Sequence, residues 1–393
     1  MQYIKNLELP LLQLHLEKEL IALQNIETAS AINDNLLKQW CIDILNSDSS
    51  ERDFLLQLNR DNNIDEAYHS FIKFVDIYRK LSRYRLSSSL EAYVLMHDLL
   101  KPLSPVYHDK LISDILKDYD EQYNLWGSFG VIEPYVKHFY NIALRYHHIL
   151  GVMIIGEMNY LVFEELFEDG DFQKIDSDEK KLLLEFLILH AAIDSAAIDD
   201  GYLSRRKAGR YFRIVSQLEE VCQASNRNEL LRKMSADSTM ERIEWLMSSY
   251  DPQIDIRSPH FYHSMLTKEQ RKLLADCDFI DGMTNIKRIT YGAKFLYCLL
   301  HRIDQPTLPH DLKKPPVGAQ SYLHFMIAMS EAAQSEDYPV EIHFKNMPQS
   351  PDARYRSFIL FEYPETSISL FNQATKIIRN GTAYLEVDLR LLF

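Results

Sequence analysis

Residues 124–170 read NLWGSFGVIEPYVKHFYNIALRYHHILGVMIIGEMNYLVFEELFEDG. Apolar residues recur in this stretch at intervals of three and four, which is the periodicity of a helix that buries one face. The periodicity predicts a single long helix over residues 131–168, ended by Gly170. Histidines and carboxylates interrupt the apolar run, so the segment combines a buried helix with side chains that can carry chemistry.

The same helical periodicity extends over most of the chain before residue 335. It predicts further helices over residues 10–27, 31–46, 64–82, 88–101, 105–121, 177–199, 203–223, 238–249, 267–278, 284–303 and 317–335. Glycine is scarce, with 11 residues among 393, whereas all-β and doubly wound folds need glycine at turns and phosphate loops. We therefore expect a mainly α protein, with a helical bundle over residues 1–335.

A different pattern begins after residue 335. Two segments alternate polar and apolar residues as half-buried strands do, a third has helical spacing and ends at a glycine, and a fourth alternates again. These segments are residues 338–344, 355–364, 365–381 and 382–393. They predict a small β-β-α-β appendage over residues 336–393, which is too short to bury a large core and is therefore expected to pack on the bundle.

Charge and hydropathy exclude several classes of protein. The formal net charge of −14 argues against a nucleic-acid partner and against docking on anionic lipid, because both require a basic surface. No run of about 18 uncharged apolar residues occurs, so no membrane-spanning helix is predicted. The N-terminal segment lacks the basic and continuous apolar regions of a signal peptide. These features predict a cytoplasmic protein.

Cysteine usage and the missing loop motifs narrow the field further. The 4 cysteines lie far apart without a CxxC pair, which predicts reduced thiols rather than disulfides or a zinc ribbon. The chain contains no GxGxxG or GxxxxGKS/T loop, no GxSxG elbow and no HExxH motif. We therefore expect neither a nucleotide cofactor nor a conventional serine hydrolase.

Glu157 is the carboxylate that most needs a partner. It lies in the apolar run GVMIIGEMNYLVF, where an ionised carboxylate must be paired, hydrogen-bonded or bound to a metal. An ion pair with a cation such as Arg145, or a position facing solvent, would explain Glu157 without a metal. We take it as a candidate metal ligand.

Two other predicted helices carry candidate metal ligands. His190 and Asp194 are four residues apart and share one helix face, a geometry that can bind one metal ion or form a structural hydrogen bond. Glu91 and Asp98 are seven residues apart on another helix, with His97 as the alternative ligand there. Carboxylate and imidazole ligands from facing helices of a bundle build di-iron and di-manganese sites.

The order of these segments resembles that of haem-oxygenase-like di-iron oxidases, including the iron-containing redox enzyme family. In that family a first core helix offers a Glu and, seven residues on, a His; a later helix offers a Glu after an apolar run; and a third offers His-x3-Asp-x2-His. LGVMIIGE, which ends at Glu157, is similar to the second element, and His190 with Asp194 matches two positions of the third. The resemblance covers residues 85–200.

Two positions depart from this family. Ala197 stands where the last His is expected, and Asp98 stands where the first helix would have its His. An altered site, a mononuclear site and a scaffold without metal are all compatible with these changes. The resemblance implies a non-haem iron cofactor, di-iron or mononuclear, that acts with O₂ on a small or amino-acid-derived substrate. His147 and His148 would then hydrogen-bond to the metal ligands.

A metal-dependent phosphohydrolase is a second interpretation of the same residues. His69, the adjacent His97 and Asp98, and the distant Asp194 follow an order similar to that of HD-type phosphohydrolases. In such enzymes these residues bind a divalent metal that activates water against a phosphoester. His108 and Asp109 form another His–Asp pair close by, which shows how readily the dipeptide arises.

A non-catalytic helical interaction protein is the third interpretation. Residues 187–204, LILHAAIDSAAIDDGYLS, resemble the acidic turns of small TerB-like helical modules. The basic run that follows, with Arg205, Arg206 and Arg210, is either an anion-binding segment or a solvated helix face. The partners expected across the three interpretations are a small-molecule substrate, a protein partner, or a second copy of the chain in a homodimer.

Overall fold

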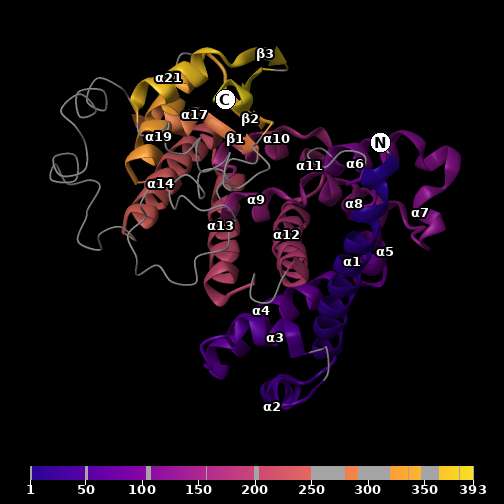
Figure 1. The fold of residues 1–393 in the computed structure, drawn as a ribbon. Helices are drawn as coiled ribbons and strands as arrows, with labels where there is room; N and C mark the ends of the chain where they lie inside the picture. The colour runs from indigo at the N-terminus through magenta and orange to yellow at the C-terminus, as the bar shows by residue number, and fades with distance from the viewer. Residues whose placement is uncertain are drawn as a thin grey trace. The chain divides into compact units, whose positions relative to one another are not determined.

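The computed structural model describes residues 2–48, 52–102, 108–155, 157–198, 203–248, 279–290, 319–334, 336–346, 363–379 and 381–392. Within these ranges the protein is mainly helical, as predicted, with a small sheet formed by residues near the C-terminus (Figure 1). The chain divides into two compact units. The first comprises Met1–Ile154 and Glu165–Ser225, and the second comprises Ile155–Glu164 and Asn226–Phe393.

Helices build the described part of the first unit. They are α1 (Gln2–Ser30), α2 (Asp34–Leu45), α3 (Arg52–Leu58), α4 (Ile64–Arg83), η1 (Ser87–Ser89), α5 (Leu90–His97), α6 (His108–Tyr123), α7 (Leu125–Ser128), α8 (Pro134–Tyr146), α9 (Ile149–Ile155), α10 (Phe163–Glu168), α11 (Gly170–Lys174), α12 (Ser177–Ile198) and α13 (Arg205–Gln223). Asparagine and serine side chains begin several of them; Asn63 Oδ1, for example, accepts a hydrogen bond from the Glu66 amide, which caps α4.

Helix α12 is the centre of the first unit. It packs against α1, α4, α8 and α13. Its apolar residues are buried on all sides, including Leu183, Leu187 and Ala192, which are fully shielded from solvent. A helix that is apolar around its whole circumference belongs in a core. Apolar packing buries α12. The polar residues His190 and Asp194 lie on this helix and are therefore in the middle of the unit.

The long helix predicted over residues 131–168 is wrong. Helix α8 ends at Tyr146, α9 spans Ile149–Ile155, and residues 157–159 are extended before η2 (Tyr160–Val162) and α10. Histidine chemistry accounts for the first break, because the Nδ1–H of His147 donates to the carbonyl oxygen of Leu144 at 2.5 Å. That carbonyl would otherwise accept the next helical hydrogen bond, and a side chain that takes it competes with the helix.

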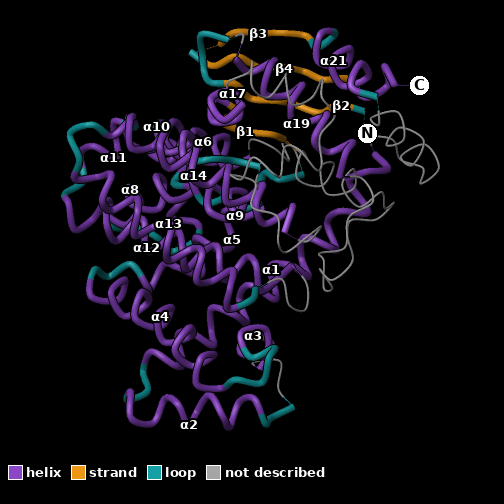
Figure 2. Tube along the Cα trace, turned by 90° about the vertical axis from the view of Figure 1, so that its left-hand side faces the viewer, coloured by secondary structure: helices purple, strands orange, loops and turns teal. Residues whose placement is uncertain are grey.

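The second unit combines helices with a four-stranded sheet. Its elements are η2, α14 (Arg227–Ser248), α17 (Phe279–Asn285), β1 (Ile286–Thr290), α19 (Ala319–Gln334), β2 (Val340–Lys345), α21 (Pro364–Asn372), β3 (Thr375–Arg379), β4 (Thr382–Asp388) and η3 (Leu389–Leu392). The strand order is β1-β2-β4-β3, and the strands are drawn in orange in Figure 2. β2 is parallel to β1 and β4, and β3 pairs antiparallel with β4.

The apolar face of this sheet packs on helices. Ile342 and Phe344 of β2 are buried, as are Leu385 and Val387 of β4. Phe325 of α19 is fully buried, with its ring 5.7 Å from that of Phe344. Since β1 and β2 are parallel, the chain must cross over between them, and α19 lies within that crossover.

The boundary predicted at residue 335 differs from the observed division. Residues 226–335 belong with the C-terminal strands, because β1 pairs with β2 and α17 packs on α19. The predicted helix over 284–303 is wrong at its start, where the β-branched sequence IKRIT forms β1. The predicted helix over 365–381 ends at Asn372, after which TKIIR forms β3.

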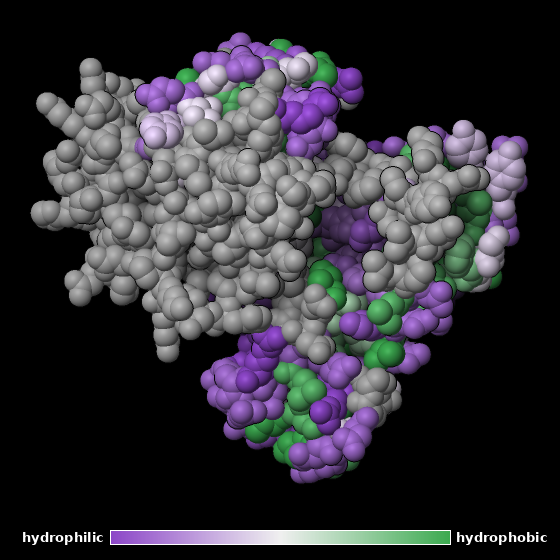
Figure 3. Space-filling model, in the orientation of Figure 1, coloured by the Kyte–Doolittle hydropathy of each residue, from purple (hydrophilic) through white to green (hydrophobic). Residues whose placement is uncertain are grey.

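Some predicted elements lie outside the described residues. They are the helix over 267–278, the rest of 284–303 and most of the strand over 355–364. Among the helices that are described, none is both long and apolar enough to cross a membrane. On the face drawn in Figure 3, apolar surface residues form small patches between hydrophilic ones.

Gly282 tests the packing of the second unit. A Cβ at this position of α17 would overlap the backbone and hydroxyl of Ser330 in α19. We expect Gly282→Ala to lower the free energy of unfolding by about 1–3 kcal/mol, because a tightly packed contact cannot accept an added methyl group. Gly209→Ala in α13 is the control, since no atom lies within 4 Å of the added Cβ. Urea denaturation measures both, and equal stability of the two variants would contradict this packing.

Candidate metal centre

Histidines and carboxylates from several helices converge in the core of the first unit. Three groups of side chains each place one potential ligand atom per residue within 4.8 Å of one another. The groups are Asp98, His108, His147 and His148; His97, His147 and His190; and His15, Glu19 and Asp194. They come from α1, the end of α5, the start of α6, the turn after α8, and α12.

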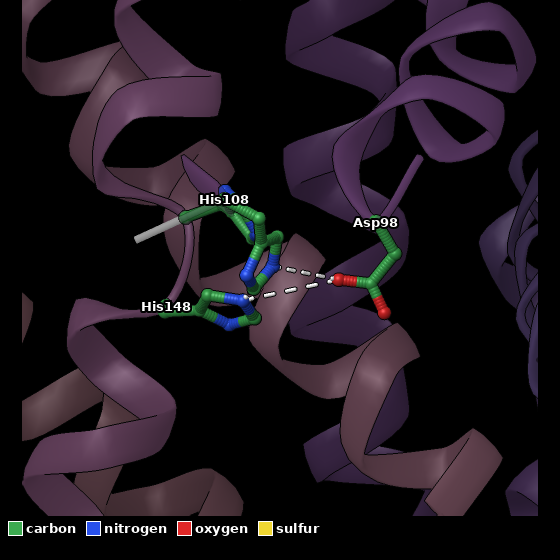
Figure 4. A group of neighbouring side chains, drawn as sticks. Asp98, His108 and His148 are labelled. Atoms are coloured by element: carbon green, nitrogen blue, oxygen red, sulfur yellow. Dashed lines mark hydrogen bonds and ion pairs between the residues drawn. The ribbon is translucent and has the colours of Figure 1, made fainter. Parts of the chain in front are cut away.

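Asp98 is the hub of the first group. Its Oδ1 lies 2.9 Å from Nε2 of His108 and 3.9 Å from Nε2 of His148. Figure 4 shows both imidazole rings directed at this carboxylate oxygen. The two Nε2 atoms of His108 and His148 are 2.7 Å apart. One ring can donate a hydrogen bond to the other, or both can direct a lone pair at one cation.

Lys101 occupies the other side of the Asp98 carboxylate. Its Nζ donates to Asp98 Oδ2 at 2.6 Å, and its side chain keeps 40 % of its surface exposed. Asp98 itself is 5 % exposed. The carboxylate therefore presents one oxygen to the imidazoles and the other to a lysine that reaches solvent.

The second group consists of imidazoles alone. His97, His147 and His190 are all buried. The Nδ1–H of His97 donates to the carbonyl oxygen of Val94 at 2.7 Å, just as His147 donates to Leu144. These bonds occupy Nδ1 of both rings and direct Nε2 into the group, which is how metal-binding histidines are oriented.

The third group links α1 to α12. Nε2 of His15 lies 3.0 Å from Oδ1 of Asp194 and 3.7 Å from Oε1 of Glu19. Glu19 is 1 % exposed, and its Oε1 is also 3.3 Å from Nε2 of His97. This carboxylate therefore lies between the third group and the imidazole group.

Burial and charge shift the pKa values of these side chains in opposite directions. Burial holds the pKa of His147 and His148 well below the usual histidine value, so both imidazoles are neutral at physiological pH. Burial also lowers the pKa of His97, but the carboxylates of Glu19 and Asp98 outweigh it and raise the pKa above its usual value. Burial raises the pKa of Asp98, yet His97, His108 and Lys101 bring it well below its usual range.

The structure brings together most of the residues singled out from the sequence. His97, Asp98, His190 and Asp194 all belong to the three groups. His147 and His148 also belong to these groups, whereas from the sequence they were expected only to hydrogen-bond to the metal ligands. Ala197 is buried on the same helix as His190. Convergence of side chains from these helices is what the metal hypothesis required.

Glu91 and Glu157 do not belong to the three groups, and their assignment as metal ligands remains a prediction. Glu91 is exposed at the start of α5, one helical turn and a half before His97. Glu157 belongs to the second unit, where its carbonyl oxygen accepts from the Ile289 amide of β1 at 2.7 Å. Glu157 is not on the predicted helix because α9 ends at Ile155, so the helical spacing used to place it does not apply.

His15, Glu19, His108 and Lys101 were missed as site residues. His15 and Glu19 are four residues apart on α1, the same spacing that marked His190 and Asp194, so this signal was present in LHLEKEL. His108 belongs to the second His–Asp dipeptide, and the dipeptide alone does not indicate a site. His69, expected beside His97, is instead exposed, and its Nδ1 contacts the Asp65 carbonyl oxygen.

The predicted anion-binding run lies on α13 and is divided between different environments. Arg205 forms ion pairs with Asp61 and Glu66. Arg206 is exposed, and Arg210 donates to the Ile154 carbonyl oxygen at 3.4 Å. Lys207, between them, is 8 % exposed and interacts electrostatically with Asp194.

The comparisons with known proteins returned nothing: no protein-family model, no curated protein and no solved structure matches the chain. The chemistry of the site therefore has to be argued from its own donor atoms. Neutral imidazoles and ionised carboxylates gathered in a core are the ligand set that divalent transition metals prefer. The buried groups fit a metal ion, and Asp98 has the most contacts within them.

The amount of bound metal distinguishes a site at Asp98 from one that uses Glu91 or Glu157. We expect Asp98→Asn to lose at least half of the bound divalent metal, whereas Glu91→Gln and Glu157→Gln keep the wild-type amount. Elemental analysis by mass spectrometry after purification without a His tag measures the difference. Loss of metal in Glu157→Gln with retention in Asp98→Asn would contradict the assignment.

Lys207 provides a pH-dependent test of the buried cluster's surroundings. Burial lowers the pKa of Lys207 from 10.5 to about 7. Between these values the unfolded chain binds a proton that the folded protein does not, so this lysine makes the free energy of unfolding rise with pH. Relative to Lys207→Met, the wild type should gain at most about 1.4 kcal/mol per pH unit across that window.

The control for this pH dependence is Lys117→Met, which removes a lysine whose side chain is 57 % exposed. Denaturation in urea at pH 6, 7.5 and 9 gives the free energy of unfolding of the wild type and of both variants. A difference between wild type and Lys207→Met that is constant over this range would show that Lys207 stays charged in the folded protein.

Proposed function

We propose that this protein is a metal-dependent phosphoester hydrolase of the HD type, with its reactive centre at Asp98, His108 and His148. The observation that carries the proposal is the position of Asp98. One carboxylate oxygen faces two imidazole Nε2 atoms, and the other accepts from the Lys101 ammonium group. A cation bound by the imidazoles would thus lie next to a lysine that can hold an anionic substrate.

The order of residues along the chain supports this proposal. His97 and Asp98 end α5 as an adjacent pair, and Asp194 lies far later on α12. His69 is exposed, and the histidine that contacts Asp194 is His15, at 3.0 Å. The His–Asp pair and the distant aspartate are therefore joined through α1, an arrangement that the sequence interpretation did not foresee.

Lys101 favours an anionic substrate. Its ammonium group is held by Asp98 at 2.6 Å while much of its side chain reaches solvent. The carboxylates Asp98, Asp194 and Glu19 raise its pKa against the lowering effect of burial, so the lysine is charged at physiological pH. Together with a metal ion bound at Asp98, the ammonium group would place two cations beside the oxygens of a phosphate.

The chemistry is hydrolysis of a phosphorus–oxygen bond. A divalent metal, when bound, lowers the pKa of a water ligand and so supplies hydroxide near neutral pH. The water oxygen forms a bond to phosphorus, the ester P–O bond breaks with its electron pair going to the alcohol oxygen, and that oxygen takes up a proton. The products are an alcohol and a phosphate. Lys101 would stabilise the charge that develops on the phosphoryl oxygens.

Oxygen chemistry at the same buried cluster is the second candidate. His190 and Asp194 belong to the cluster, and both match positions of the haem-oxygenase-like di-iron oxidases. Imidazoles with carboxylates also suit iron. Glu91 and Glu157, the two glutamates that this proposal needs, lie outside the three groups. The hydrolase is favoured because it uses the residues that converge.

Phosphate release tests the proposal. The full-length protein, loaded in turn with Mn²⁺, Fe²⁺ or Zn²⁺, is assayed on p-nitrophenyl phosphate, bis(p-nitrophenyl) phosphate and nucleoside monophosphates. We expect metal-dependent release of product that falls at least about 100-fold in Asp98→Asn. Lys101→Met should mainly raise KM for the phosphoester, because it removes a charge that binds the substrate.

The matched control is His69→Gln, which removes an exposed histidine of the first unit and should leave turnover unchanged. Consumption of O₂ by the iron-loaded protein is measured in parallel with an oxygen electrode. Iron-dependent O₂ uptake with no phosphate release from any substrate would overturn the hydrolase and favour the oxidase.

A further inference from the structure

We propose that His97, His147 and His190 bind a second metal ion, distinct from the one at Asp98, His108 and His148, in a site built from imidazoles and closed to solvent. The site takes an ion of the Zn²⁺ and Fe²⁺ class rather than Mg²⁺. The proposed function concerns only the ion at Asp98, His108 and His148. The site at His97, His147 and His190 is inferred from the arrangement of those three rings.

Buried nitrogen atoms without hydrogen-bond partners carry the proposal. Among the described residues, Nε2 of His147 and both ring nitrogens of His190 are buried and have no hydrogen-bond partner, whereas Nε2 of His97 lies 3.3 Å from the Glu19 carboxylate. Buried polar atoms in folded proteins are nearly always satisfied by protein, water or an ion. Several unsatisfied nitrogens at one place in a core therefore point to a ligand that they share.

The three rings are arranged around a common centre. The centroid distances are 5.3 Å for His97 and His147, 4.9 Å for His97 and His190, and 5.0 Å for His147 and His190. The interplanar angles are 86°, 72° and 87°. The rings thus form a nearly equilateral triangle without stacking, and each offers a nitrogen within 4.8 Å of the others.

The tautomers are already set for metal binding. His97 and His147 each donate Nδ1–H to the carbonyl oxygen three residues earlier, so Nε2 is the nitrogen of each ring that can coordinate a metal, which in His97 would displace the Nε2 proton. Metal-ligating histidines are held in this way by a carbonyl or carboxylate on the other nitrogen. Neutral imidazole is the form that coordinates a metal.

The donor set decides which metals fit. Imidazole nitrogen suits Zn²⁺, Fe²⁺, Cu²⁺ and Ni²⁺, whereas Mg²⁺ requires oxygen ligands. The nearest carboxylate to the group is Glu19, with Oε1 3.3 Å from His97 Nε2 and with no hydrogen-bond partner among the described residues for either oxygen. Glu19 can therefore supply the negative charge that three neutral rings lack.

Exposure separates the two sites. The side chain of His148 is 21 % exposed and that of Lys101 is 40 % exposed, so the first site opens to solvent. His97, His147 and His190 are at most 3 % exposed. The second ion should exchange slowly and should hold α5, α12 and the turn after α8 together, whereas the first should exchange quickly.

Metal counting with matched variants tests the second site. The full-length protein is stripped with a chelator, reconstituted with Zn²⁺ or Co²⁺, desalted and analysed by mass spectrometry. We expect 2 equivalents in the wild type, 1 in His190→Gln, 1 in His108→Gln and 2 in the control His69→Gln. Co²⁺ bound in His108→Gln should show the intense visible absorption of a tetrahedral site, and that band should be absent in His190→Gln.

A measurement on the unaltered protein keeps the test independent of variant folding. Released Zn²⁺ is followed with a coloured chelator, and two phases that differ at least 10-fold in rate are expected from the wild type. A single equivalent, a single phase, or a full 2 equivalents in folded His190→Gln would overturn the second site. Two equivalents with no phosphoester hydrolysis would instead reject the proposed function and leave the second site standing.

Discussion

The Asp98 carboxylate holds together the centre of the first unit. A buried carboxylate is very unfavourable unless cations or hydrogen-bond donors surround it. His97, His108 and His148 lie within 4 Å of Oδ1, and Lys101 binds Oδ2. Because these side chains come from the end of α5, the start of α6 and the turn after α8, the charge of one aspartate fixes how three segments meet.

Helix α12 provides the scaffold against which this cluster is organised. Its apolar surface is buried on all sides, so its position is determined by packing rather than by its polar residues. His190 and Asp194 are carried inward on that helix, and α1 brings His15 and Glu19 to meet them. The core thus combines strong apolar packing with a polar interior, in which the carboxylates of Asp98, Asp194 and Glu19 face His15, His97 and Lys101.

The path of the chain explains why Glu157 does not lie on the predicted helix. The segment of residues 155–164 leaves the first unit and belongs to the second, where Met158 bridges to Arg288 of β1. The Asn159 side chain donates to the carbonyl oxygens of Thr284 and Ile286 at 2.8 and 2.9 Å. Backbone and side-chain hydrogen bonds at the edge of β1 therefore fix this segment, and its apolar sequence reflects burial beside a sheet instead of a helix.

The spacing of apolar residues is enough to predict the helical class of the protein, the positions of α4, α12 and α13, the strands β2 and β4, and the placement of His190 and Asp194 on one helix face. Local periodicity sets these features, because burial of one face is visible in the spacing of apolar residues. The contact between His15 and Asp194, which are 179 residues apart in the chain, is visible only in the folded protein. Which buried faces come together depends on long-range packing. In addition, a single side chain can end a helix, as His147 does by donating to the Leu144 carbonyl oxygen, and the helical spacing then no longer applies to the residues that follow.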